Sequence, residues 1–165
     1  MIVRDRRSIL AFGVGVLLAA MVVSAAQAAP PTRTTEPPFD FDNDGSLFCG
    51  FPLRAETLQN NVKITTFSDG HQLVTGRRTV RLTNLSTGKS LVLTDAGHLT
   101  TDPEQTADTF TGRLVFPLFP GEPLGPGVWL FEGKVVATFA EPGGFFYANV
   151  DITGSRVDLC AALRG

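Results

Sequence analysis

The fold is decided by the stretch of residues 76–97, which reads G-R-R-T-V-R-L-T-N-L-S-T-G-K-S-L-V-L-T-D-A-G. Residues 84–89 within it are turn formers and include a glycine that tolerates positive φ. On either side of this turn, apolar residues recur at every second position, which is the period of a strand with one buried face. They are Val80, Leu82, Leu91 and Leu93. The stretch therefore predicts a β-hairpin.

The rest of the chain repeats this pattern of short strand-like runs separated by turn signals, and it contains no long amphipathic helix. Such a pattern is typical of an all-β sandwich or barrel. We expect 128–131 and 134–140 to form a hairpin about Glu132-Gly133, and the end of the last run suits a helical turn. The strand-like runs outside the first hairpin are 47–56, 62–67, 71–75, 97–101, 109–119, 128–131, 134–140, 145–153 and 156–163.

Two cysteines, Cys49 and Cys160, lie near the start of the first strand-like run and in the last one. Two ligands are too few for a structural zinc site, and disulfides persist outside the cytosol. A bridge between them requires the first and last elements to be neighbours. This favours a single antiparallel meander forming a closed or partly open β-barrel. A two-sheet β-sandwich is the alternative.

The chain begins with features of a secretory signal peptide in residues 1–28. Arg4, Arg6 and Arg7 precede an uncharged apolar run, which ends at an A-x-A site formed by Ala26 and Ala28. This order predicts export and cleavage after Ala28. A membrane anchor is the alternative, but the run is short for a span. The arginine pair leaves export by the general or the twin-arginine route open.

Cleavage after Ala28 leaves 137 residues, enough for one domain with a core. They hold 11 basic and 15 acidic residues, a net charge of −4. The segment 29–45 is rich in proline and threonine and then acidic, and we expect it to be an extended linker to a β-domain at 46–165. Without a basic stripe, nucleic acid is not an expected partner.

The acidic end of that linker, Asp40-Phe41-Asp42-Asn43-Asp44-Gly45, matches the first half of an EF-hand calcium loop. Position twelve of such a loop requires a bidentate glutamate, and here it is Phe51. We therefore expect a solvated acidic turn and no cofactor. Calcium bound by Asp40, Asp42 and Asp44 is the alternative.

Residues able to carry chemistry are sparse in the mature chain. His71 and His98 both adjoin a glycine at expected turns, and no G-x-S-x-G motif is present. Nine aromatic residues crowd the region from Phe110 to Tyr147, and they suit either a core or an apolar pocket. The proline- and glycine-rich run 120–127 would then be a lid, or a rigid loop inserted into a protease. The candidate pocket residues are Trp129, Phe131, Phe145 and Tyr147.

Several short motifs resemble those of small secreted proteins of high-GC Gram-positive bacteria. They are Cys49-Gly50-Phe51-Pro52, Leu82-Thr83-Asn84 with Thr87-Gly88-Lys89, the 120–127 loop before an aromatic hairpin, and Asp158-Leu159-Cys160-Ala161. The resemblance covers most of the mature chain and implies no known activity, so it assigns no catalytic residue.

Taken together, these features predict a secreted, monomeric, non-enzymatic β-domain that binds an extracellular or envelope partner. A carrier of small apolar ligands and a barrel enzyme of isomerase or cyclase type are alternatives. A protease inhibitor acting through the 120–127 loop is a further one.

Overall fold

The computed structural model describes residues 29–45 and 47–164. The expected signal peptide, residues 1–28, lies outside the described residues. Within them, the chain forms antiparallel strands and one short helix, as predicted. The strands are β1 (Thr32–Thr35), β2 (Phe41–Asn43), β3 (Leu53–Asn60), β4 (Lys63–Thr66), β5 (Gln72–Asn84), β6 (Ser90–Thr101), β7 (Ala107–Leu118), β8 (Gly127–Phe139) and β9 (Tyr147–Asp158), and the helix is α1 (Leu159–Arg164).

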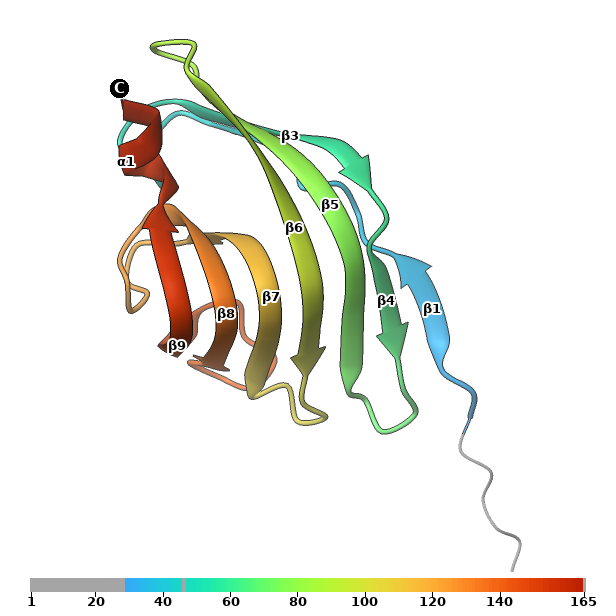
Figure 1. Ribbon diagram of the computed structural model, residues 1–165. Coiled ribbons are helices and arrows are strands. Elements are labelled where there is room, and N and C mark those ends of the chain that lie inside the picture. Colours follow the sequence, from blue (N-terminus) through green and yellow to red (C-terminus); the bar gives the residue numbers. More distant parts are fainter. Residues whose placement is uncertain (1–28, 46, 165) are drawn as a thin grey trace, which may run out of the picture.

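All strands belong to one curved sheet, in which β5 to β9 follow one another as a meander (Figure 1). β3 pairs with the second half of β5, and β2 pairs with the other edge of β3. β4 pairs with the first residues of β5, and β1 pairs with the other edge of β4. The sheet is not closed, and β9 forms the edge opposite to β1. This is the single, partly open sheet that the sequence allowed, and it is neither a closed barrel nor a two-sheet sandwich.

A row of glycines crosses five strands at the same level. Each glycine is the register partner of the next, in the order Gly76, Gly97, Gly112, Gly133 and Gly154. All five have positive φ, and a Cβ on any of them would lie 2.0–2.5 Å from a backbone oxygen of a neighbouring segment. Glycine kinks of this kind introduce curvature into a sheet. The row therefore bends all five strands at one level.

This row corrects several predicted strand ends. The hairpin expected about Glu132-Gly133 is instead the middle of β8, and the breaks expected near Gly76 and Gly154 lie inside β5 and β9. Glycine interrupts the sequence pattern in the same way whether it ends a strand or bends one. The hairpin of residues 76–97 itself is confirmed, with Val80 opposite Leu93.

The segment 29–45, expected as a linker, contributes β1 and β2 to the sheet. β1 pairs with β4 and β2 with β3, so both strands lie on the periphery of the sheet. The prolines of this segment flank the paired residues and do not interrupt them. Edge positions tolerate such neighbours because a missing backbone donor there breaks no ladder.

The predicted disulfide is present, with the Cα atoms of Cys49 and Cys160 5.1 Å apart. Cys49 precedes β3 and Cys160 lies in α1, so the bridge fixes the helix to the start of the domain. Around it lies a core made by β3, β5, β7, β8 and α1. Its fully buried members are Leu53, Val80, Leu82, Val115, Val128 and Leu163.

β6 and β7 separate along part of their length. They pair only between Ala96 and Thr101 on β6, whereas β7 pairs with β8 over its full length. Residues 114–118 of β7 thus have no strand partner on their β6 side, which leaves an opening in the sheet. No helix in the described part of the chain is long and apolar enough to cross a membrane.

Candidate functional site

Three adjoining cavities lie inside the curve of the sheet, and we call them together the cleft. Their volumes are about 160, 330 and 20 Å³, and Leu99 and Leu114 line all three. The two larger ones also share Glu36 and Arg78. Most of the remaining lining is apolar or aromatic, including Phe110, Phe116, Phe119, Phe139 and Tyr147.

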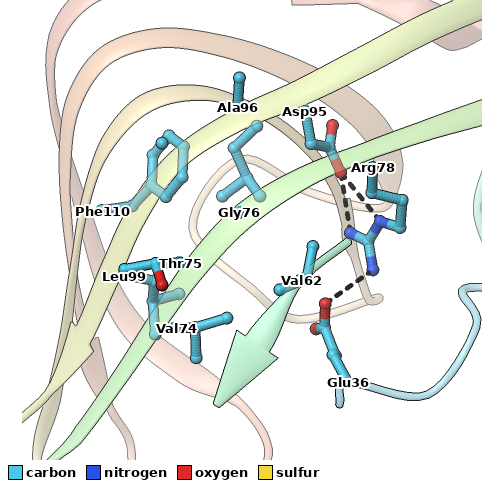
Figure 2. A pocket seen from close by; sticks show the side chains of 12 residues that line it. Glu36, Val62, Val74, Thr75, Gly76, Arg78, Asp95, Ala96, Leu99 and Phe110 are labelled. Carbon is cyan, nitrogen blue, oxygen red and sulfur yellow. Dashed lines mark hydrogen bonds and ion pairs between the residues drawn. The ribbon is translucent and has the colours of Figure 1, made fainter. Parts of the chain in front are cut away.

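An arginine with two carboxylates lines the cavity of about 160 Å³ (Figure 2), and the arginine and one of the carboxylates also line the cavity of about 330 Å³. Arg78 donates from Nε and Nη2 to Oδ2 of Asp95, at 3.1 and 2.8 Å. Its Nη1 donates to Oε2 of Glu36 at 3.3 Å, and its guanidinium lies 4.8 Å from the ring centre of Phe39. Arg78 and Asp95 are 8% and 6% exposed, so this ion pair is removed from solvent.

The position of Asp95 follows from the separation of β6 and β7. Asp95 directly precedes Ala96, the first residue of β6 that pairs with β7, and its Oδ1 accepts a hydrogen bond from the backbone N–H of Val115 at 2.8 Å. The carboxylate thus satisfies a buried donor that the sheet has left without a strand partner. Asp95 therefore stabilises the opening in the sheet as well as binding Arg78.

Burial sets the protonation of both acids. The pKa of Asp95 is raised by desolvation, which outweighs the hydrogen bond and charge of Arg78. The pKa of Glu36 is also raised, by desolvation first, with Arg78 opposing and Asp95 adding to the shift. One guanidinium shared between two carboxylates is not enough to offset their burial. Both acids therefore hold a proton more readily than they would in water.

Tyr147 lines two of the three cavities, and its hydroxyl donates to Oδ2 of Asp108 at 2.7 Å. Burial and this hydrogen bond raise the pKa of the Tyr147 phenol, so it stays neutral. Glu122 is 6% exposed and accepts from the backbone N–H groups of Phe119 and Tyr147, at 2.5 and 2.9 Å. It ties the 120–127 loop to the start of β9.

Six phenylalanines form a continuous series of ring contacts, which we call the aromatic rim. Neighbouring ring centres are 5.1–5.5 Å apart along the series. It connects the segment before β3 to the loop before β9, and three of its members line the largest cavity of the cleft, the one of about 330 Å³. Phe145 is 68% and Phe146 50% exposed, which places large apolar groups in solvent beside the cleft. In order, the rim contains Phe39, Phe41, Phe48, Phe119, Phe145 and Phe146.

The structure separates the four candidate pocket residues. Phe145 and Tyr147 line the largest cavity, and Phe131 is fully buried beside the smallest one. Trp129 is half-buried under the guanidinium of Arg156, 5.6 Å from its ring centre, and does not line the three cavities of the cleft. The cleft thus lies nearer to β5, β6 and β7 than the pocket that the sequence suggested around Trp129.

The acidic turn is occupied by contacts within the protein. Asp42 forms an ion pair with Arg54 at 2.8 Å, and Asp40 accepts from the backbone N–H of Thr57 at 2.5 Å. Among the described residues, Asp44 included, no group of three acidic, histidine or cysteine side chains is arranged to hold a metal ion. His71 stacks on Phe67.

The 120–127 loop lies against the domain. Glu122 is buried in it, and Leu124 packs onto the core formed by Phe110, Leu118 and Phe131. An inhibitory loop would have to stand clear of the body to enter a protease, so this arrangement gives that alternative no support.

Sequence reasoning missed the polar residues of the cleft, yet one signal for them was present. In the hairpin register, Arg78 and Asp95 are opposite each other, two positions from the pair formed by the buried Val80 and the partly buried Leu93. The period of two assigns them to the same buried face. An arginine and an aspartate opposite each other on a buried face predict a buried ion pair. Glu36, by contrast, reaches Arg78 from a segment expected to be a linker.

Comparison of this chain with models of protein families, with curated protein sequences and with solved structures gives no match.

Proposed function

We propose that the protein binds a small, mainly apolar molecule in the cleft. The observation that carries this proposal is the largest cavity of the cleft, which holds about 330 Å³ and is lined mostly by aromatic and aliphatic side chains around a few polar groups. Small-molecule sites have this composition and this order of volume. The exposed rings of Phe145 and Phe146 suit a site that apolar molecules enter.

A neutral fluorescent probe, N-phenyl-1-naphthylamine, tests this proposal. We expect saturable enhancement of its emission on titration with the protein. Leu99→Trp fills the part of the cleft common to all three cavities and should abolish the enhancement. Val92→Trp is the matched control, because Val92 lies on the same strand and is 57% exposed. Absence of saturable binding, or equal binding by both variants, would contradict the proposal.

A second candidate is an enzyme of isomerase or cyclase type acting in the same cleft. The carboxyls of Glu36 and Asp95 favour it, since both line the cleft and burial raises their pKa values, which lets each hold a proton at a higher pH than a carboxyl in water does. Isomerisation conserves mass. A ligand that binds in the cleft would be incubated with the protein and analysed by chromatography and mass spectrometry. A change in its elution time without a change in its mass, seen with wild type and not with Glu36→Gln, would support the enzyme over the carrier.

We also propose that the protein acts outside the cytosol, as a monomer that meets its ligand or an envelope partner there. The disulfide supports export, because such bonds persist in oxidising compartments. N-terminal sequencing of the protein from culture medium should begin at Ala29. A protein retained in the cells with residues 1–28 intact would argue against export.

A further inference from the structure

The polar groups of the cleft carry an excess of negative charge. Among the described residues that line it, four are acidic and one is basic. Arg78, the basic one, already binds two of the carboxylates. A negatively charged ligand group would therefore enter without a free cation to receive it. The acidic residues are Glu36, Asp95, Asp108 and Glu122.

One of these four carboxylates is placed to meet a ligand. Asp95, Asp108 and Glu122 each accept hydrogen bonds from two groups of the protein itself. Glu36 accepts from Arg78 through Oε2 at 3.3 Å, its side chain remains 29% exposed, and it lines both larger cavities. Glu36 is thus the acidic group most open to the cleft.

The largest cavity of the cleft, which Glu36 lines, is surrounded by aromatic rings. Ring faces attract cations, and cages of such rings recognise ammonium groups in proteins. The cleft already contains one contact of this kind, between the guanidinium of Arg78 and the ring of Phe39. The rings that line the largest cavity belong to Phe39, Phe116, Phe119, Phe139, Phe145 and Tyr147.

We infer that the ligand of the cleft is an apolar amine, whose ammonium group lies beside Glu36 and whose apolar part lies among the aromatic rings. The inference rests on the proposed function and names its ligand class. A bound ammonium supplies the positive charge that the pair Glu36 and Asp95 lacks, and so opposes the effect of their burial on their pKa values.

The test compares three probes of matched length that differ in their head group: octylammonium, octanol and octanoate. We expect isothermal titration calorimetry at pH 7 and low salt to give the order ammonium, alcohol, carboxylate. The ammonium should bind about tenfold more tightly than the carboxylate, a ratio that corresponds to 1.4 kcal/mol. Glu36→Gln should weaken octylammonium binding more than octanol binding. Glu104→Gln, which removes the same charge from an exposed position outside the cleft, should change neither.

The outcomes separate this inference from the proposed function. Tightest binding of octanoate, or equal binding of all three probes, would overturn the amine inference while leaving an apolar-ligand site in place. Binding of none of the probes would count against the proposed function itself. The order of the three affinities in the wild-type protein decides the inference even if Glu36→Gln does not fold.

Discussion

Arg78 and Asp95 are cross-strand partners on β5 and β6, and their side chains are joined by two hydrogen bonds inside the fold. Asp95 also accepts from the backbone of β7, so the pair connects three strands at the point where β6 and β7 separate. The same guanidinium also binds Glu36, which lines two cavities of the cleft. The stability of the fold and the proposed binding of a ligand should therefore both depend on one buried group.

Loss of Arg78 should destabilise the domain strongly. Arg78→Met leaves Asp95 buried without its cation, and breaking such a pair costs about 3–5 kcal/mol of unfolding free energy. Urea denaturation measures this change. Arg54→Met is the control, since Arg54 pairs with Asp42 at an exposed position and its loss should change the midpoint little. Equal, small effects of both substitutions would show that the Arg78 pair is not a structural requirement.

Glu36 should make stability fall as the pH rises. Its pKa is raised by burial above the ordinary 4.5, so the folded state holds a proton that the unfolded state releases. The contribution is fully present below pH 4.5 and is lost as the pH passes the folded value. The difference in unfolding free energy between wild type and Glu36→Gln should therefore decrease from pH 4 upward.

Asp102 provides the opposite control for this pH series. A hydrogen bond from Thr106 lowers the pKa of Asp102, so its contribution is present above the ordinary 3.8 and is lost as the pH falls. The difference in unfolding free energy between wild type and Asp102→Asn should therefore increase as the pH rises, the reverse of the change expected for Glu36→Gln. If the unfolding free energies of wild type and Glu36→Gln changed in parallel with pH, the raised pKa of Glu36 would be contradicted.

The glycine row should be intolerant of a methyl group. A Cβ on Gly133 would lie 2.3 Å from the carbonyl oxygen of Thr153, at a φ of +126°. Backbone strain alone costs about 1–3 kcal/mol at such a position, and the clash adds to it. Gly88→Ala is the control, because Gly88 also has positive φ but has open space around it. Thermal unfolding should show a clearly larger loss for Gly133→Ala than for Gly88→Ala.

The sequence predicted the sheet well where local pattern determines it. Alternation and turn residues locate the 76–97 hairpin, and the cysteine pair brings the ends of the domain together. The sequence-based prediction was wrong where a glycine can either end a strand or bend it. Gly133 and Gly154 lie inside strands, and the bend there depends on register with three other glycines. Register between distant strands is a tertiary property, which composition and spacing do not carry.

The cleft was predictable only in part for the same reason. Arg78 and Asp95 share a strand pair that the pattern identifies, so their contact follows from the hairpin. Glu36 and Glu122 reach the cleft from segments without periodicity, and only the folded chain brings them there. Trp129 illustrates the converse, since its aromatic surroundings suggested a pocket that lies nearer Phe116 and Tyr147.

The disulfide should contribute substantially to stability. It joins residues 111 positions apart, and chain-entropy models assign about 4–5 kcal/mol to a loop of that length. Replacing both Cys49 and Cys160 by serine should lower the melting temperature markedly, and thiol titration of the unfolded, unreduced wild type should detect no free thiol. Two titratable thiols per chain would contradict the bridge.

Trp129 should report on packing and not on the ligand. Its side chain lies under Arg156 and beside the core of Phe110, Leu118 and Phe131, outside the cleft. Trp129→Ala removes that packing and should cost about 3 kcal/mol, the low end for a large aromatic residue because the side chain is only half-buried. Trp129→Phe retains most of the contact and should cost clearly less.

Probe binding separates these two roles of Trp129. Trp129→Phe should bind N-phenyl-1-naphthylamine as wild type does, since the residue lines no part of the cleft. Octylammonium, which absorbs no tryptophan emission, should leave the intrinsic fluorescence unchanged while calorimetry shows saturation. A saturable change in the tryptophan emission would instead place Trp129 in contact with the ligand. That change should then be lost in Leu99→Trp and kept in Val92→Trp, each corrected for the emission of its added tryptophan. The binding site would then extend along β8 beyond the cleft described above.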